Sequence, residues 1–121
     1  MAKLAVLISG AGIAGCTLAY WLARGGHAVT VVERSGSLRS SGSPVDVRGP
    51  AADVAERMNI AAQLREARIR LAGMTFLDSS GHRIARVDIE QLRSSIVPKD
   101  IEIARGDLAR ILYEASASDA E

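Results

Sequence analysis

Leu4-Ala-Val-Leu-Ile-Ser9 is followed at once by Gly10-Ala-Gly-Ile-Ala-Gly15, and this stretch decides the fold of the chain. An apolar segment continues to Leu22, and a second apolar run, Val29-Thr-Val-Val-Glu33, comes next. The order is that of a strand, a glycine-rich turn, a helix and a second strand. The sequence therefore predicts a dinucleotide-binding βαβ unit, and we expect its first strand to be a central one that is covered on both faces.

The glycines of this turn have different expected tasks. Gly10 allows the tight turn out of the strand, Gly12 lets a pyrophosphate approach the backbone, and Gly15 lets the helix pack close to the sheet. Ala14 lies in the first turn of the helix predicted over 13–24, whose free N–H groups and positive dipole end would face the diphosphate. We therefore predict that these four residues bind a cofactor.

Glu33 stands at the end of the second predicted strand. A carboxylate at this position can accept both hydroxyl hydrogens of an adenosine ribose, and it repels a 2′-phosphate. The sequence thus favours FAD or NAD over NADP as the bound dinucleotide. A βα turn that binds nothing stays open as the structural alternative.

Composition limits the other classes of function. The chain has 121 residues, of which 48% are hydrophobic and 24% charged, so one ordinary globular domain with a core is expected. Fifteen basic residues against fourteen acidic ones give a net charge of +1, and only 3% of residues are aromatic. Neither a basic surface nor a stacking platform is indicated, so we expect no nucleic-acid partner.

The single cysteine, Cys16, and the N-terminal hydrophobic segment bear on the compartment. Cys16 cannot form an internal disulfide and lies in the first predicted helix, which fits a reducing cytoplasm and a buried, inert thiol. The apolar segment near the N-terminus is interrupted by glycines and leads directly into a second strand, so a membrane span is not expected. We therefore predict a cytoplasmic protein.

The middle of the chain changes character after the βαβ unit. The polar segment 35–44 is rich in Gly and Ser and predicts a loop, and 45–49 predicts a short strand. A helix is expected to begin at Pro50, and apolar residues continue at helical spacing to Leu71 with a break near Asn59. Helical structure is therefore expected over most of this region.

In the last part of the chain, the spacing of the apolar residues changes from the helical period to a period of two. Residues 74–89 alternate with period two about a Ser-Ser-Gly turn, which predicts an antiparallel hairpin. A short strand is expected over 101–104, followed by a helix that begins near Arg105 with Asp107 as its cap. Because a hairpin does not belong in a doubly wound parallel sheet, a second layer or domain is expected to begin here.

Three stretches make the chain resemble the N-terminal part of the FAD-dependent aromatic monooxygenases of the para-hydroxybenzoate hydroxylase type, in their tetracycline-degrading and polyketide-tailoring branch. These stretches are 10–34, 39–57 and 105–112, and the last reads Arg105-Gly-Asp-Leu-Ala-Arg-Ile-Leu112. They are spread over nearly the whole length of the chain, and the third is more discriminating than the glycines.

The resemblance also implies roles for individual residues. Glu33 would hold the adenosine ribose of FAD, and Arg34 would lie along the adenosine. Arg39 would lie near the side of the flavin that nicotinamide reaches, and Asp46 near the flavin itself. Arg105 would contact FAD from the start of its helix.

The resemblance implies an α/β fold: a Rossmann-like FAD-binding βαβ unit together with the beginning of an antiparallel substrate-domain sheet. On this basis residues 1–72 are assigned to the FAD-binding domain, 73–104 to the substrate domain, and 105–121 to a helix that returns to the FAD-binding domain. Family members are about three times as long, so we expect a partial piece of such an enzyme. The fold would be incomplete, the 121 residues alone inactive, and the site completed by the rest of the protein or by a complementary chain.

The function implied is hydroxylation of an aromatic or polyketide-like small molecule with FAD, NAD(P)H and O₂. No Ser-His-Asp set, metal-ligand cluster or carboxylate pair at usable spacing occurs, so no catalytic or metal-binding side chain is predicted. Two alternatives stay open: an NAD-dependent dehydrogenase or reductase, and a non-catalytic dinucleotide-binding fragment.

Overall fold

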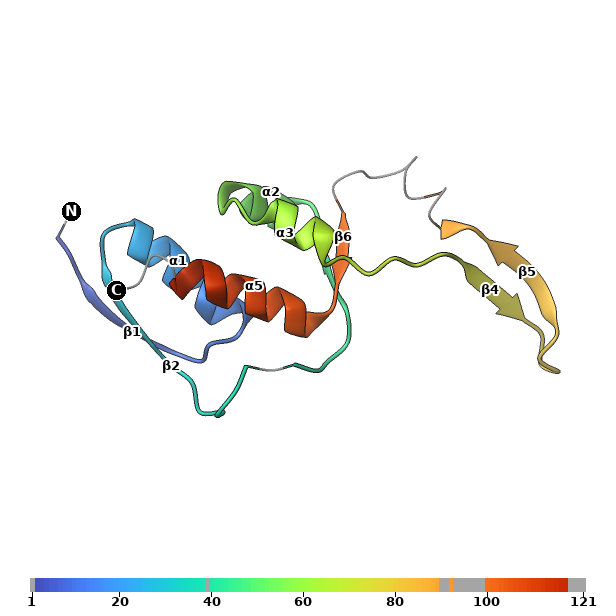
Figure 1. Cartoon of the computed structure of the whole chain (residues 1–121), viewed down its shortest axis with the longest axis horizontal. Coiled ribbons are helices and arrows are strands. Elements are labelled where there is room, and N and C mark those ends of the chain that lie inside the picture. The colour runs from blue at the N-terminus through green and yellow to red at the C-terminus, as the bar shows by residue number, and fades with distance from the viewer. Residues whose placement is uncertain (1, 39, 90–91, 93–99, 118–121) are drawn as a thin grey trace.

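A computed structural model describes residues 2–38, 40–89, 92 and 100–117 of the chain (Figure 1). Its first elements are β1 (Ala5–Ser9), α1 (Ile13–Arg24) and β2 (Ala28–Val32). β1 and β2 are parallel neighbours, in a register that runs from Ala5 opposite Ala28 to Ser9 opposite Val32. The predicted βαβ unit is confirmed, and α1 has the bounds expected from the sequence.

The β1–β2 sheet is not covered on both faces, so that expectation was wrong. Ile8 is buried, but Leu7 is 69% exposed and Val32 46%. Side chains alternate between the two faces of a strand, and α1 packs on one face only. Among the described residues no element lies over the other face, which leaves its apolar side chains exposed.

The core lies where α1 meets α5 (Arg105–Ala117), which run side by side in Figure 1. Cys16 and Tyr20 from α1 and Leu108, Ile111 and Leu112 from α5 are buried in one cluster. Burial of each leucine or isoleucine side chain among them contributes about 1.5–3 kcal/mol to the hydrophobic stabilisation. The last helix of the described chain is thus a structural partner of the first.

A second pair of strands and two short helices complete this body. β3 (Val45–Val47) and β6 (Ile101–Ile103) pair in antiparallel fashion, with Asp46 opposite Glu102. Their apolar side chains face inward, and Ile103 is fully buried. α2 (Pro50–Arg57) has proline at its first position, where the missing N–H costs nothing, and α3 (Ala61–Glu66) packs near α5.

The helical region is shorter than its apolar spacing predicts. Asn59, with φ of +59°, separates α2 from α3 at the expected break. α3 ends at Glu66, and the chain then runs beside β6, where the Ile69 N–H donates to the Glu102 carbonyl oxygen at 2.7 Å. The expectation of helix near Leu71 was therefore wrong, because backbone pairing with a strand distant in sequence replaces the helical hydrogen bonds.

The predicted hairpin is present as β4 (Met74–Leu77) and β5 (Arg83–Val87). The turn is held by the Asp78 carboxylate, which accepts the Ser80 and His82 N–H groups, each at 2.8 Å. Every residue of both strands is exposed, and the hairpin projects away from the helices in Figure 1. Its assignment to a substrate domain stays a prediction, whereas β6, assigned to the same range, pairs with β3 against the core.

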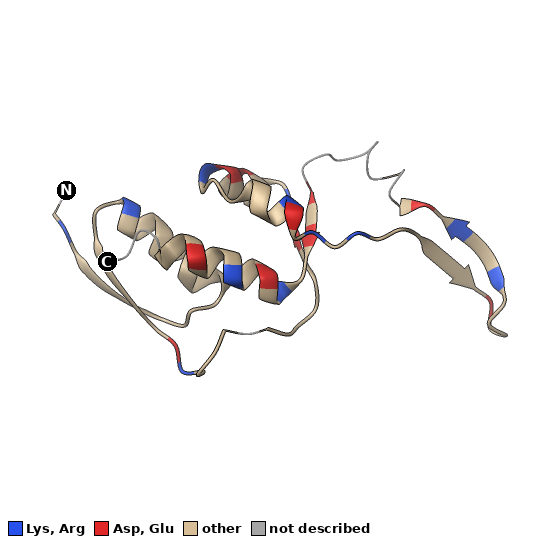
Figure 2. Ribbon diagram, viewed as in Figure 1, with Lys and Arg blue, Asp and Glu red and all other residues tan. Residues whose placement is uncertain are grey.

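Charged residues are interspersed along the described chain (Figure 2). On α5, Arg110 lies 3.6 Å from Asp107 and 3.2 Å from Glu114. Asp107 lies in the first turn of α5 and not at its cap, because the helix already begins at Arg105. In the part of the chain that the structure describes, no helix is long and apolar enough to cross a bilayer.

Candidate functional site

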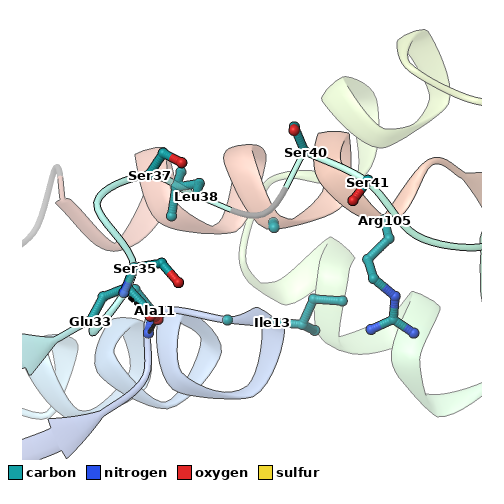
Figure 3. Close-up of a pocket in the computed structure, with 11 residues that line it drawn as sticks. Ala11, Ile13, Glu33, Ser35, Ser37, Leu38, Ser40, Ser41 and Arg105 are labelled. Carbon is teal, nitrogen blue, oxygen red and sulfur yellow. Dashed lines mark hydrogen bonds between the residues drawn. The ribbon is translucent and has the colours of Figure 1, made fainter.

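A pocket of about 430 Å³ opens beside the ends of β1 and β2 and the start of α5. Figure 3 shows Glu33 and Ala11 at one end of the pocket and Arg105 at the other. The βαβ unit, the segment after β2 and α5 all contribute to its walls. The lining residues are Ala11, Gly12, Ile13, Glu33, Ser35, Ser37, Leu38, Ser40, Ser41, Arg105 and Ala109.

The turn between β1 and α1 is tight for two separate reasons. Gly10 has φ of +105°, a conformation that residues with a side chain rarely adopt, and its N–H donates to the Val32 carbonyl oxygen at 2.7 Å. A Cβ on Gly15 would collide with the Gly10 carbonyl oxygen. Both predicted roles are confirmed, since Gly10 makes the turn and Gly15 lets α1 approach it.

Gly12 forms the N-terminal cap position of α1 and lines the pocket. A Cβ added here would meet no atom within 4 Å, so the space beside Gly12 is open and is not filled by another part of the protein. No side chain caps the helix, and the first N–H groups of a helix have no acceptor within it. The pocket wall therefore presents backbone donors and the positive end of a helix dipole, which favour an anion.

Glu33 follows β2 and ties the turn to the segment beyond it. Its Oε2 accepts the Ala11 N–H at 2.9 Å and its Oε1 accepts the Ser35 N–H at 2.8 Å. These backbone N–H groups, that of Ser35 first and then that of Ala11, hold the pKa of the Glu33 carboxyl below its ordinary value. Glu33 is therefore a carboxylate at neutral pH, fixed in position and exposed to the pocket.

Among the described residues that line the pocket, Arg105 is the cationic one. It stands at the first position of α5, half-buried, and its side chain extends toward the side where Ile13 lies (Figure 3). Arg48, Arg65 and Arg110 each pair with a carboxylate. Among the described residues no carboxylate pairs with Arg105, so its guanidinium donors remain available to a ligand.

The other predicted site residues that the structure describes lie outside the lining of this pocket. Ala14 is exposed in the first turn of α1, and Arg34 is exposed directly after Glu33. Asp46 lies on β3, where its carboxylate is 3.0 Å from the Arg48 guanidinium. Arg39 falls outside the described residues. The structure thus brings Gly12, Glu33 and Arg105 to one pocket.

Several lining residues were not predicted from the sequence. Four belong to the polar segment after β2, namely Ser35, Ser37, Ser40 and Ser41. Its high Gly and Ser content predicted a loop, and a long polar loop directly after a predicted ribose-binding carboxylate was the available signal. Leu38 and Ala109 gave no sequence signal, because their place depends on how the loop meets α5.

A second cavity, of about 340 Å³, lies between α1, β2 and the end of α5. Its walls are largely apolar, and Cys16 lies on one of them. Burial raises the pKa of the Cys16 thiol, and its Sγ donates to the Ala11 carbonyl oxygen at 3.4 Å. The expected inert thiol is consistent with this setting. The described residues contain no cluster of metal-ligating side chains.

Two curated relatives cover most of this chain. An uncharacterized protein of Mycobacterium tuberculosis is 43% identical over 96% of the chain, and the flavin-dependent monooxygenase eupH of a Phoma species is 42% identical over 96%. The chain spans 32% and 27% of the lengths of these two proteins. It is therefore similar to about a third or less of each relative.

Solved structures agree with these relatives. The tetracycline destructase Tet(55) superposes with a TM-score of 0.82 at 34% identity, and CtdE in complex with FAD with a TM-score of 0.72 at 26% identity. Each match covers 98% of this chain and 28% of the solved one. The likeness to part of the FAD-dependent monooxygenases is confirmed, and so is the α/β fold. Residues 5–73 match the family model for FAD dependent oxidoreductases, and the chain belongs to that family.

Proposed function

We propose that the chain supplies part of the FAD site of a flavin-dependent monooxygenase that hydroxylates an aromatic or polyketide-like small molecule with NAD(P)H and O₂. The similarity to the flavin-dependent monooxygenase eupH supports this activity, and the similarity to the tetracycline destructase Tet(55) supports this class of substrate. Because the chain spans about a third or less of these proteins, the activity belongs to the whole protein of which these residues form the dinucleotide-binding part.

The observation that carries the proposal is the chemistry gathered in one pocket. Backbone donors at the start of α1, the Glu33 carboxylate and the Arg105 guanidinium, which pairs with no carboxylate in the described part of the chain, share its walls. Diphosphate, ribose hydroxyls and a further electron-rich group of the cofactor match these three kinds of partner. The residues present thus fit FAD.

Glu33 keeps room for a ribose although it already accepts two N–H groups. Its carboxylate has about four lone-pair positions, and the Ala11 and Ser35 N–H groups occupy one on each oxygen. The Arg34 N–H and the Ser35 side chain also act on this carboxylate as hydrogen-bond partners, so a ribose hydroxyl would use a position that these groups leave open or would replace one of them. The same negative charge disfavours a 2′-phosphate and hence NADP in this pocket.

Bound FAD would supply the redox chemistry, which none of the lining side chains can perform. The chain's own residues would bind and orient it: Gly12 beside the diphosphate, Glu33 at the ribose, and Arg105 as a positive charge near the cofactor. Arg34 would lie along the adenosine, while Arg39 and Asp46 would face the flavin, as the family resemblance implies. Ala14 would contribute its backbone at the start of α1.

The proposal also includes the division into domains, the cellular location and the way in which the flavin site is completed. Residues 73–104 would begin the substrate domain, which is supported by a hairpin whose apolar side chains are all exposed. A cytoplasmic location is supported by the single, buried, reduced cysteine. The rest of the protein, or a complementary chain, would complete the flavin site.

The cofactor content of the full-length protein tests the proposal. We expect the purified protein to be yellow and to release FAD on denaturation, as identified by chromatography of the supernatant. Arg105→Ala should lower the molar ratio of flavin to protein, whereas Arg110→Ala, on the same helix but outside the pocket, should not. A colourless protein that releases NAD would contradict the proposal.

A further inference from the structure

The loop after β2 lies so close to the first turn of α5 that there is no room for a side chain at Gly106. A Cβ on Gly106 would lie 2.9 Å from the Ser40 carbonyl oxygen and 3.0 Å from its carbonyl carbon. These are backbone atoms, so the loop itself would have to move to make room. Gly106 therefore permits a direct contact between the two backbones at one end of the pocket.

A second glycine, Gly42, follows Ser40 by two positions in the same loop and lies against the side chain of Arg105. Gly42 has φ of +130°, and a Cβ there would lie 2.9 Å from Cδ of Arg105 and 3.4 Å from its Nε. Glycine is thus favoured here both by the backbone conformation and by the lack of space. The aliphatic stem of Arg105 lies where a side chain at position 42 would have to be.

The way in which Arg105 is held differs from that of the other arginines described above. Arg48, Arg65 and Arg110 are paired with carboxylates. Arg105 has no such partner in the described chain and has a glycine packed against its stem instead. Packing of the stem limits the rotamers of an arginine and leaves its guanidinium donors unused.

We propose that Gly42 and Gly106 are positioning residues for FAD binding, acting through Arg105. Gly106 seats the loop on α5, and Gly42 fixes the path of the Arg105 stem so that the guanidinium faces the cofactor pocket. This inference rests on the proposed FAD site. It adds that a loop glycine, with no side chain to offer a ligand, helps set the affinity for FAD.

A double-mutant cycle on the full-length protein tests the coupling, with the dissociation constant of FAD measured by flavin fluorescence quenching. Gly42→Ala should weaken FAD binding about tenfold in the native background and less than about twofold in an Arg105→Ala background. The unfavourable φ is the same in both backgrounds, so the cycle isolates the contact with the stem. Equal losses in both backgrounds, or no loss in either, would overturn the proposal.

Gly36→Ala is the matched control in the same loop, because a Cβ there meets no atom within 4 Å and its φ is not in the left-handed range. It should leave FAD affinity unchanged. If Gly42→Ala alone does not fold, the double variant Gly42→Ala/Arg105→Ala should fold, because the clashing stem is gone, with a urea midpoint below that of Arg105→Ala only by the cost of the unfavourable φ at position 42. A double variant that remains unfolded would count against the contact.

A readout without cofactor separates this inference from the proposed function. Phenylglyoxal modifies exposed guanidinium groups, and peptide mass spectrometry reports the rate at each arginine. In the apoprotein, Gly42→Ala should raise the modification rate of Arg105 relative to that of Arg110. An unchanged ratio would overturn the positioning role even if FAD binds, and a raised ratio in a protein that binds no FAD would overturn only the FAD site.

Discussion

The two ends of the pocket are built in different ways. At one end, the wall formed by Gly10–Gly15 and Glu33 comes from a single βαβ unit of consecutive elements, joined by strand pairing, by a backbone hydrogen bond from Gly10 to Val32 and by the Glu33 carboxylate. At the other end, Arg105 meets the loop after β2 across a long separation in sequence, through close contacts at Gly42 and Gly106. We refer to these as the βαβ wall and the loop wall.

The difference indicates which wall contributes mainly to the stability of the fold and which mainly to the affinity for FAD. The βαβ wall is part of the packed body, so changes in it affect the fold as well as the ligand. The loop wall lies on an exposed segment, and Arg105 is only half-buried, so changes there should affect the ligand more than the fold. Substitutions on the two walls should separate these effects.

The largest effect is expected from Gly15→Ala in the βαβ wall. The added methyl group collides with the Gly10 carbonyl oxygen, and overpacking of this kind costs about 1–3 kcal/mol. Both the free energy of unfolding and FAD binding should fall, although alanine is normally the better helix former. Urea denaturation of the apoprotein measures the first and FAD titration the second. An unchanged urea midpoint would contradict the close approach of α1 to the turn.

Gly12→Ala, three residues away, sharpens the comparison within the same wall. Its Cβ would meet no protein atom, so the free energy of unfolding should stay the same, but the methyl group would occupy space proposed for the diphosphate. FAD binding should weaken about five- to 150-fold, since a steric conflict of about 1–3 kcal/mol corresponds to that range. Isothermal titration with FAD checks this, and native affinity would exclude a diphosphate beside Gly12.

Arg105→Ala probes the loop wall. Loss of a charge-assisted hydrogen bond to the cofactor should weaken FAD binding about tenfold. The urea midpoint should change little, because the guanidinium makes no ion pair within the described chain. Arg110→Ala is the matched control, since it removes ion pairs with Asp107 and Glu114 but lies outside the pocket. A loss of stability without a loss of affinity would make Arg105 a structural residue.

The smallest of the expected effects is that of Glu33→Gln, a modest loss of stability that depends on pH. The folded-state pKa of Glu33 is lowered, so its contribution is complete above the ordinary value of 4.5 and is lost as the pH falls through the lower folded value. The difference in urea midpoint between native protein and variant should therefore be constant near neutrality and shrink below about pH 4.5. A difference that grows on acidification would contradict the direction of the shift.

The two walls also differ in how far the sequence predicts them. Gly10, Gly12, Gly15 and Glu33 follow one another in a local pattern, and the turn, the bounds of α1 and the parallel pairing were all predicted from it. Arg105 was indicated only by resemblance to a family, because no local pattern links it to the loop. The serines of the loop and Ala109 depend on a tertiary contact, which periodicity cannot reveal.

The errors in the fold have the same origin. Apolar residues at helical spacing predicted a helix near Leu71, but the backbone of Ile69 pairs with β6 instead. Leu7 on β1 was expected to be buried, but it is exposed because no described element covers that face of the sheet. Asp107 has the composition of a cap but lies inside the helix. Each case depends on contacts between distant segments, whereas the glycine turn depends on neighbours.

Parallel titration of the full-length apoprotein with FAD and with NAD tests the central claim most directly. Quenching of flavin fluorescence measures the first dissociation constant, and isothermal calorimetry measures the second. The proposed site predicts tight, saturable binding of FAD at one equivalent per chain and no measurable competition by NAD. Tight binding of NAD with no binding of FAD would contradict it.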